Sequence, residues 1–262
     1  MIKYGILGWP LERSYSPIIH TFLLKHTSIE GKYELIKMNE INKKNIDQIN
    51  KSYSGYNITI PYKEKILKVC EGAHLDVHVE KIGSVNTVNN KGGITSFYNT
   101  DYLGFLNFLE IINFNPEGKK IMILGSGGSS KSINYALSLV KGEATIISRA
   151  NKEGSISYQD LNERANEVEV IINTTPIGMP PYENETLDIN VENFNNLEFA
   201  MNIGYGPNNN FLNLFNDNIQ KFDGLGMLIC QAIESFNIWT SSELTITSIY
   251  HEVFKELEKQ ND

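Results

Sequence analysis

A glycine-rich turn between apolar segments is the clearest chemical signal in the sequence. Gly125 and Gly127 follow the apolar run of residues 121–124, and a helical pattern and a second strand-like run at 144–147 come next. The first glycine permits a tight turn, and the second removes a Cβ that would hold the backbone away from a pyrophosphate. The helix that follows offers free N–H groups and the positive end of its dipole to that phosphate. These residues predict a dinucleotide-binding strand–turn–helix–strand unit.

The end of the second strand distinguishes the two nicotinamide dinucleotides. An acidic residue is expected there for NAD, whereas this chain has Ser148-Arg149-Ala150 and no carboxylate before Glu153. The planar guanidinium of Arg149 suits a 2′-phosphate, which favours NADP. Two alternatives stay open at this point. Ser130 replaces the third glycine of the pattern, so the turn is also compatible with an ordinary left-handed turn, and Arg149 with a solvated side chain.

A second set of polar residues lies at the ends of strands predicted in the first hundred residues, where ligands of open α/β sheets bind. Lys63 follows one such strand and Asp101 ends the domain. An oxidoreductase that acts on an alcohol needs a proton carrier and hydrogen bonds that orient the substrate, and this cation and anion supply both. Taken singly, a solvated lysine and a helix N-cap are the simpler interpretations.

The elements that would position these residues alternate between strand and helix, which is typical of an α/β fold with two domains. Residues 115–118, with Pro116 and Gly118, form the best linker candidate. The predicted strands are residues 2–8, 33–37, 55–60, 85–88 and 94–97, then 121–124, 144–147, 168–173 and 199–203. The predicted helices are residues 18–25, 41–49, 62–70, 76–82, 101–112, 227–239 and 243–258.

The composition limits the classes of protein to which the chain belongs. Its 262 residues are 41% apolar and 21% charged, which suits about two globular domains. A net charge of −8 and the lack of a basic block argue against a nucleic-acid surface. No apolar stretch is long enough for a membrane helix or a signal peptide. Cys70 and Cys230 are isolated and the histidines lack metal-binding spacing, so we expect no metal, no membrane and a cytoplasmic location.

Seven short motifs resemble the shikimate dehydrogenase family, in the order in which that family carries them. They are SYSPIIH (14–20), NITIPYK (57–63), GSVNTV (83–88), YNTD (98–101), GSGGS (125–129), NTTPIGM (173–179) and GLGML with Gln231 (224–231). The resemblance implies an α/β substrate domain of residues 1–100, to which C-terminal helices 226–262 return, and a Rossmann-type NADP-binding domain of residues 101–225. It implies reversible NADPH-dependent reduction of 3-dehydroshikimate to shikimate, in the pathway to aromatic amino acids, by a monomer or homodimer.

The resemblance also implies the site residues. Lys63 and Asp101 are the implied catalytic pair, in which Lys63 passes the proton to or from the C3 oxygen of the substrate. The substrate-binding residues implied beside this pair are Ser14, Ser16 and Tyr205 for the carboxylate, and Thr59, Asn86 and Gln231 for the ring hydroxyls. The cofactor-binding residues implied are Gly125, Ser126, Gly127, Gly128, Ser129, Ser148, Arg149, Ile203 and Gly224.

The chain departs from the family's pattern at two informative places. Ser148-Arg149-Ala150 replaces the usual Asn-Arg-Thr and lacks one hydroxyl for the phosphate, and Asn202 stands where aspartate is usual. A quinate-preferring or dual dehydrogenase is the nearest alternative, which the intact Ser14 and Arg149 disfavour. A non-catalytic NADP-binding sensor is the alternative of another class, and it would be expected to lose a member of the catalytic pair.

Overall fold

The computed structural model describes residues 1–11, 14–150, 153–178, 182, 185–206 and 209–259. The chain divides into two compact units. Unit 1 joins Met1–Ile111 to Leu228–Asp262, and unit 2 is Ile112–Met227. The helix α5 (Asp101–Ile111), which the sequence analysis places in the cofactor domain, therefore belongs to unit 1. The α/β class is confirmed, and the C-terminal segment does return to the first unit.

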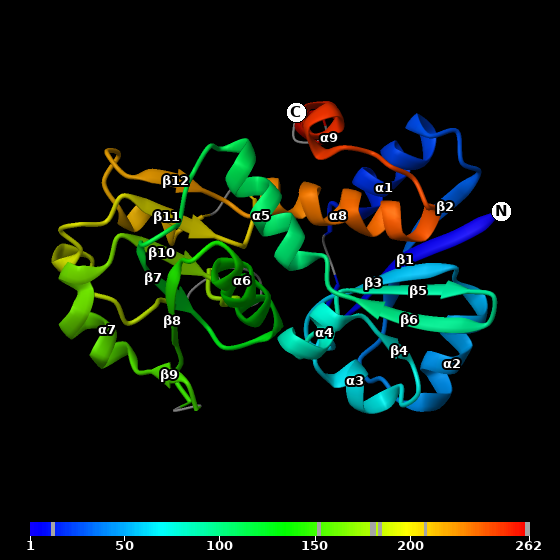
Figure 1. The fold of residues 1–262 in the computed structure, drawn as a ribbon, viewed down its shortest axis with the longest axis horizontal. Coiled ribbons are helices and arrows are strands. Elements are labelled where there is room, and N and C mark those ends of the chain that lie inside the picture. The colour runs from blue at the N-terminus through cyan, green and yellow to red at the C-terminus, as the bar shows by residue number, and fades with distance from the viewer. Residues whose placement is uncertain (12–13, 151–152, 179–181, 183–184, 207–208, 260–262) are drawn as a thin grey trace. The chain divides into compact units, whose positions relative to one another are not determined.

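Unit 1 contains a mixed sheet with the strand order β2-β1-β3-β5-β6-β4 over the described residues (Figure 1). β1 runs parallel to both β2 and β3, whereas β5 runs antiparallel to β3 and to β6. Because β5 runs in the opposite direction to β3, the first residue of β5 lies beside the last residues of β3, at one end of the strands. The strands are β1 (Ile2–Gly8), β2 (Gly31–Lys37), β3 (Gly55–Ile58), β4 (His74–Leu75), β5 (Thr87–Lys91) and β6 (Ile94–Tyr98).

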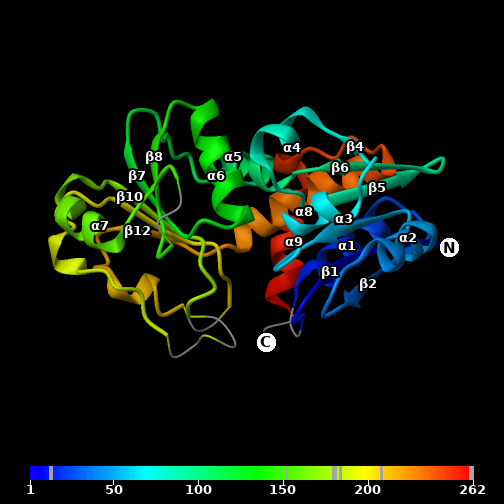
Figure 2. The ribbon, with the colours of Figure 1, turned by 90° about the horizontal axis from the view of Figure 1, so that it is seen from below.

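Helices cover both faces of this sheet (Figures 1 and 2). On one face, Ile46, Ile66 and Val79 from three helices pack with strand residues such as Tyr56 in a buried apolar cluster. On the other face, the ring of Trp239 stacks on Tyr4 of β1, with centroids 4.9 Å apart. The helices of unit 1 besides α5 are α1 (Ser16–His26), α2 (Lys43–Ser52), α3 (Lys65–Val69), α4 (Val77–Ile82), α8 (Leu225–Thr240, which begins in unit 2) and α9 (Ile246–Glu258).

Unit 2 contains an all-parallel sheet with the order β12-β11-β10-β7-β8-β9 over the described residues. With β7 counted as strand 1 and the sheet read from β9 to β12, this order is 3-2-1-4-5-6, the Rossmann arrangement. The order reverses between β7 and β10, and ligands of such sheets bind at that switch point, outside the carboxyl ends of the strands. The elements are β7 (Lys120–Leu124), α6 (Gly128–Leu139), β8 (Glu143–Ile147), β9 (Ser155–Ile156), α7 (Tyr158–Arg164), β10 (Val170–Asn173), β11 (Phe199–Asn202) and β12 (Gln220–Phe222). Short 3₁₀ helices occur at Ala165–Glu167, Val191–Asn193 and Leu212–Leu214.

The sequence patterns identify most elements and miss the helix α7 and the three shortest strands. β4, β9 and β12 are two or three residues long, too short for an alternating pattern, and each lies at an edge of its sheet. The helix α1 begins at Ser16, with Tyr15 in the N-cap position, so it starts two residues before the predicted start at residue 18. No helix in the described part of the chain is long and apolar enough to cross a membrane.

His20, on the sheet-facing side of α1, is a buried titratable group in the core of unit 1. Its side chain is 1% exposed, and its ring stacks on Tyr33 with centroids 4.3 Å apart. Among the described residues, neither ring nitrogen has a hydrogen-bond partner. Burial lowers the pKa of His20 to about 3, against a smaller opposing effect of the Asn57 side chain. The imidazole is therefore neutral in the folded protein at physiological pH.

We expect His20 to make unit 1 sensitive to mild acid. The unfolded chain takes up a proton at this histidine below about pH 6.5, whereas the folded protein does not, so protonation favours unfolding. The stability from this group is complete above about pH 6.5 and is lost as the pH falls from there toward the folded value of about 3. Between pH 7 and pH 5 the loss is about 2 kcal/mol.

Chemical denaturation at pH 7, 6 and 5 measures this loss. We expect His20→Phe, which has no titrating ring, to have a flatter pH dependence than the unsubstituted protein. His74→Gln removes an exposed histidine on β4 and serves as the control, with an unchanged slope. Equal slopes for His20→Phe and the unsubstituted protein would show that His20 is not the group responsible.

Candidate active site

Several predicted substrate residues of unit 1 lie together at one end of the sheet, where the carboxyl ends of β1 and β3 are. Leu7 and Ile58 pair at the carboxyl ends of β1 and β3. At the same edge, Thr87 at the start of β5 pairs with Asn57 on one side and with Tyr98, the last residue of β6, on the other. The segments that adjoin these strand ends carry Ser14, Ser16, Thr59, Lys63, Asn86 and Asp101.

Lys63 and Asp101 form an ion pair at this edge. Lys63 Nζ lies 2.6 Å from Asp101 Oδ2, and their side chains are 14% and 7% exposed. Asn99 Oδ1 accepts the backbone N–H groups of Asp101 (3.1 Å) and Tyr102 (3.4 Å) at the start of α5. Because Asn99 satisfies the helix start, the Asp101 carboxylate is available to Lys63. The interpretation of Asp101 as a helix N-cap is therefore wrong.

Asn86 connects this pair to the C-terminal helix α8. Its Nδ2 donates to Asp101 Oδ1 at 2.8 Å and to Gln231 Oε1 at 3.2 Å. Gln231 is 8% exposed, so it is not a solvated residue on the outer side of α8. A Cβ on Gly104 of α5 would lie 2.6 Å from the Gln231 Cβ, which shows how closely α5 and α8 approach. The structure thus brings together four of the predicted residues, Lys63, Asp101, Asn86 and Gln231.

The remaining predicted substrate residues lie in both units. Ser14 Oγ accepts the backbone N–H of Ser16 at 3.2 Å, where α1 begins. Thr59 follows β3, and a Cβ on Gly8 would lie 2.4 Å from its Cγ2, so its side chain sits against the end of β1. Tyr205 belongs to unit 2 and follows β11. The three residues predicted for the substrate carboxylate are therefore divided between the units.

A buried polar layer that the sequence analysis largely missed lies next to Asn86. Asn57 Nδ2 donates to Ser235 Oγ at 2.9 Å, and Tyr33 donates its phenolic proton to Asn57 Oδ1 at 2.8 Å. Ser235 is fully buried on α8. One signal for it was present, because Gln231 and Ser235 are four residues apart and share a helix face.

In unit 2, the predicted glycine turn has the geometry that its residues imply. Gly125 has a φ of +107°, and a Cβ there would lie 2.7 Å from Thr174 Oγ1, so only glycine fits. Gly127 is exposed, and a Cβ there would meet nothing within 4 Å. The N-cap residue of α6 is Gly127, which has no side chain with which to cap the helix. A helix N-terminus that follows such a glycine turn suits a phosphate, because its backbone N–H groups and its dipole attract an anion.

The carboxyl end of β8 holds the residues predicted to select the cofactor. Ser148 is buried, and its hydroxyl lies 3.1 Å from that of Ser126 in the glycine turn. Arg149 is exposed. Burial raises the pKa of Tyr158 on α7, and the positive charge of Arg149 acts in the opposite direction. Ser126, Ser148 and Arg149 thus lie along the ends of β7 and β8.

Ile203 and Gly224 meet where β11 ends and α8 begins. A Cβ on Gly224 would lie 1.9 Å from the Ile203 carbonyl oxygen, so this approach requires glycine. The Ile203 N–H donates to the Asn173 carbonyl oxygen at 2.9 Å, which ties this loop to the end of β10.

Asn202, where the family usually has aspartate, is part of a row of amides. Asn173 Nδ2 donates to Asn202 Oδ1 at 3.1 Å, and Asn202 Nδ2 donates to Asn209 Oδ1 at 2.9 Å. An aspartate would accept the first bond and could not make the second. Met179, the last residue of the 173–179 motif, lies outside the described residues.

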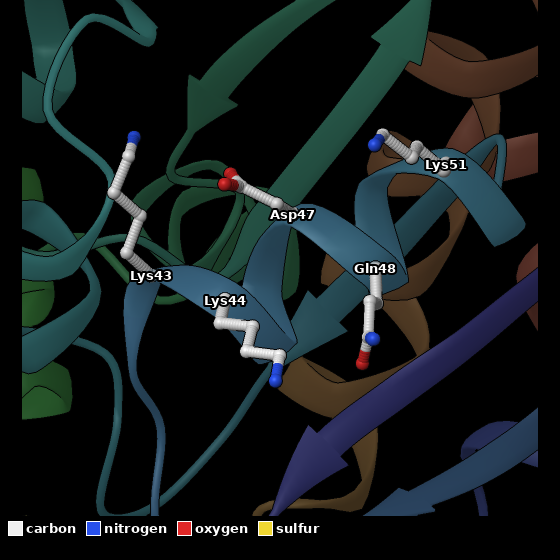
Figure 3. A pocket seen from close by; sticks show the side chains of 5 residues that line it. All are labelled: Lys43, Lys44, Asp47, Gln48 and Lys51. Carbon is white, nitrogen blue, oxygen red and sulfur yellow. The ribbon is translucent and has the colours of Figure 1, made fainter.

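A surface hollow along α2 does not have the features of a ligand site. Its lining consists of Lys43, Lys44, Asp47, Gln48 and Lys51, all from this one helix. In Figure 3 the three lysine amino groups point in different directions, so no polar groups converge there. Within the described residues there is no group of three or more metal-ligating side chains. The candidate site is therefore the edge of the unit 1 sheet, with the glycine turn of unit 2 as the cofactor region.

Comparison with known proteins gives a consistent result. A model of the shikimate dehydrogenase substrate binding domain matches residues 6–88. The shikimate dehydrogenase (NADP(+)) of Methanococcus vannielii is 36% identical over 267 residues, which cover 91% of this chain and 91% of that protein. Shikimate dehydrogenase 1 from Peptoclostridium difficile matches with a TM-score of 0.87 and 28% identity over 98% of both chains. Shikimate 5-dehydrogenase from Thermus thermophilus, in complex with shikimate, matches with a TM-score of 0.83 and 25% identity, covering 98% of this chain and 100% of that one. The chain belongs to the shikimate dehydrogenase family.

Proposed function

We propose that this protein catalyses the reversible reduction of 3-dehydroshikimate to shikimate with NADPH. The observation that carries the proposal is the Lys63–Asp101 ion pair, held by Asn86 and Gln231 at the sheet edge of a chain with full-length relatives of that activity. We assign the substrate to unit 1 and the cofactor to unit 2. In the reduction, the carbonyl carbon at C3 gains a hydride and its oxygen gains a proton. The bound dinucleotide supplies the hydride, and residues of the chain must supply the proton.

Lys63 is the proton donor in this proposal. A lysine ammonium has three N–H donors, so it can donate to an oxygen of the substrate as well as to Asp101 Oδ2. The side chain is 14% exposed, and the amine regains its proton from water after each turnover. In the oxidative direction the neutral amine takes the proton from the C3 hydroxyl. Asp101 holds the lysine in place through Oδ2 and is itself held by Asn86 through Oδ1.

The substrate would be oriented by neutral side chains. Ser14, Ser16 and Tyr205 are proposed for the carboxylate, and Thr59, Asn86 and Gln231 for the ring hydroxyls. Neutral donors bind a carboxylate through hydrogen bonds without forming a buried ion pair, which permits product release. The edge geometry supports the unit 1 part of this assignment, because the ends of β1, β3, β5 and β6 meet there.

NADP fits the residues of unit 2. The N-terminus of α6 and its dipole suit the pyrophosphate, which the backbone of Gly125, Ser126, Gly127, Gly128 and Ser129 would approach closely. The Ser148 hydroxyl and the Arg149 guanidinium would bind the 2′-phosphate. Ile203 and Gly224 would line the nicotinamide side. Their mutual contact, which a Cβ on Gly224 would prevent, supports a shared role.

The cellular location and the oligomeric state are two further properties that we propose. Cys70 and Cys230 are free thiols, which suits a reducing compartment, and we infer a cytoplasmic location. A monomer or a homodimer is the expected oligomeric state, which sedimentation velocity would measure.

A dehydrogenase that prefers quinate is the nearest alternative function. Assays with shikimate or quinate against NADP or NAD, followed by nicotinamide absorbance, distinguish the two.

We expect Lys63→Ala to keep its fold and to lose turnover by ~10²–10⁴-fold, the usual contribution of a positioned proton carrier. Its dissociation constant for NADP, measured by fluorescence titration, should stay unchanged, because Lys63 lies in unit 1. Lys68→Ala removes an exposed lysine on α3 and is the control. A folded Lys63→Ala protein with near-normal turnover would refute the assignment.

We expect Arg149→Ala to weaken NADP binding by about tenfold or more while leaving NAD binding nearly unchanged, since NAD has no 2′-phosphate for the guanidinium to bind. The wild-type preference for NADP should be modest, because Ala150 offers no hydroxyl. Arg164→Ala, a second exposed arginine of unit 2, is the matched control. Equal losses for NADP and NAD would mean that Arg149 has a structural role instead.

A further inference from the structure

Four buried side chains of unit 1 form a closed ring of hydrogen bonds next to the Lys63–Asp101 pair. They are Asn86, Thr100, Ser235 and Thr87, each no more than 2% exposed. Around the ring, Asn86 Nδ2 lies 2.9 Å from Thr100 Oγ1, which lies 2.9 Å from Ser235 Oγ. Ser235 Oγ lies 2.8 Å from Thr87 Oγ1, which lies 2.9 Å from Asn86 Oδ1. The ring therefore begins and ends on one amide.

The chemistry of that amide sets the direction of every bond in the ring. Asn86 Oδ1 only accepts, so the Thr87 hydroxyl donates its single proton to it. When all four bonds are made, Thr87 accepts from Ser235, and Ser235 accepts from Thr100, whose hydroxyl has a longer alternative acceptor in Asn86 Oδ1 at 3.2 Å. Thr100 accepts from Asn86 Nδ2, which only donates. Within the ring each hydroxyl thus donates once and accepts once, and hydrogen bonds arranged head to tail in this way strengthen one another.

Two neighbouring contacts support this direction. The backbone N–H of Thr100 donates to Asn86 Oδ1 at 2.6 Å, which places the oxygen end of the amide on the Thr87 side. Asn57 Nδ2 donates to Ser235 Oγ at 2.9 Å, which uses one of the lone pairs of that oxygen. With Oδ1 fixed, the Nδ2 end of Asn86 points toward Asp101 Oδ1 at 2.8 Å.

We propose that Ser235 and Thr87 are positioning residues for the catalytic pair and act through the amide of Asn86. The inference rests on the proposed function for its effect on turnover. Outside the ring, the Thr100 N–H holds the oxygen end of the amide, and Nδ2 lies 2.8 Å from Asp101 Oδ1 and 3.2 Å from Gln231 Oε1. The ring adds a hydroxyl at each end, Thr87 at Oδ1 and Thr100 at Nδ2, so that one Nδ2 proton goes to Thr100 and the other stays aligned with Asp101 Oδ1, with Gln231 Oε1 as its longer second acceptor. Asp101 in turn fixes Lys63 Nζ.

The ring also explains why α8 carries a serine at this position. Ser235 lies one turn after Gln231 and is the member of the ring that α8 contributes. Its hydroxyl lies 3.0 Å from the Gln231 carbonyl oxygen as well, an acceptor that competes with Thr87 for the same proton. Loss of this hydroxyl would open the ring and leave Asn57 Nδ2 without its nearest acceptor.

Turnover measurements on ring variants test the proposal. Ser235→Ala and Thr87→Val each open the ring, and we expect each to lower kcat by about tenfold, less than the ~10²-fold that a misplacement of 1 Å can cost. The dissociation constant for NADP should be unchanged. Because one opening already breaks the ring, the double variant should have nearly the same kcat as either single variant. Thr87→Ser retains the hydroxyl and should restore most of the kcat lost in Thr87→Val.

Thr240→Val is the matched control on α8. The Thr240 hydroxyl donates to the carbonyl oxygen four residues earlier, Phe236, at 2.7 Å, a backbone contact of the kind that Ser235 also has. Thr240 is outside the ring, so its loss should change stability slightly and leave kcat unchanged. A folded Ser235→Ala protein with kcat within about twofold of wild type would overturn the proposal, as would additive losses in the double variant. If Ser235→Ala does not fold, the Thr87→Val and Thr87→Ser pair decides by the same criterion.

A second readout does not depend on turnover. The side-chain amide protons of Asn86, observed by NMR, should exchange slowly with solvent in the wild-type protein. In Ser235→Ala and Thr87→Val they should shift and exchange faster, whereas Thr240→Val should leave them unchanged. Unmoved Asn86 resonances in both ring variants would overturn the ring. Absence of wild-type turnover with shikimate and NADP would refute the proposed function instead, and the NMR result would still stand.

Discussion

The desolvation of Lys63 and Asp101 is the physical constraint on which the polar structure of unit 1 depends. Their side chains are only 14% and 7% exposed, and removing two charges from water costs about as much as their attraction returns. Such a pair adds little to stability unless hydrogen bonds satisfy its remaining atoms. Asn86 binds the second carboxylate oxygen, and Asn99 takes over the helix start that Asp101 would otherwise cap. The pair therefore adds little net stability, which agrees with the catalytic role proposed for it.

In unit 2, the backbone N–H groups at the start of a helix take the place that the charged pair has in unit 1. Two helices begin with capping boxes, made by Asn42 for α2 and Ser157 for α7, whereas α1, α3 and α9 have no side-chain cap hydrogen bond from the N-cap residue. The start of α6 has no side-chain cap, and its N-cap residue is the exposed Gly127. A phosphate at a helix N-terminus is stabilised by backbone N–H groups and by the positive end of the helix dipole. The uncapped helix thus lies at the carboxyl end of β7, at the switch point of the Rossmann sheet, where a dinucleotide phosphate would occupy it.

Local sequence patterns predicted the parts of this protein whose cause is local. The glycine turn at Gly125 and the buried strands around it are set by backbone sterics and by burial on both faces of the sheet. The position of Asp101 was open, because in sequence it resembles an N-cap, and the fold shows instead that Asn99 accepts at the helix start and that Asp101 pairs with Lys63. The ring of Asn86, Thr87, Thr100 and Ser235 joins segments far apart in the chain, so no local pattern encodes it.

Amides have a particular value at both sheet edges because they donate at one end and accept at the other. A hydroxyl can reverse its bond, and a carboxylate can only accept, so neither alone gives a network a single direction. Asn86 orders the hydroxyls of unit 1 in this way, and its Nδ2 end is left to hold Asp101. The row Asn173, Asn202 and Asn209 does the same in unit 2 with three amides in sequence. In that row Asn202 donates one further hydrogen bond, to Asn209 Oδ1, which a carboxylate at position 202 could not donate. The substitution that departs from the family's pattern is thus consistent with its neighbours, because Asn209 Oδ1 supplies the acceptor that the extra amide proton requires.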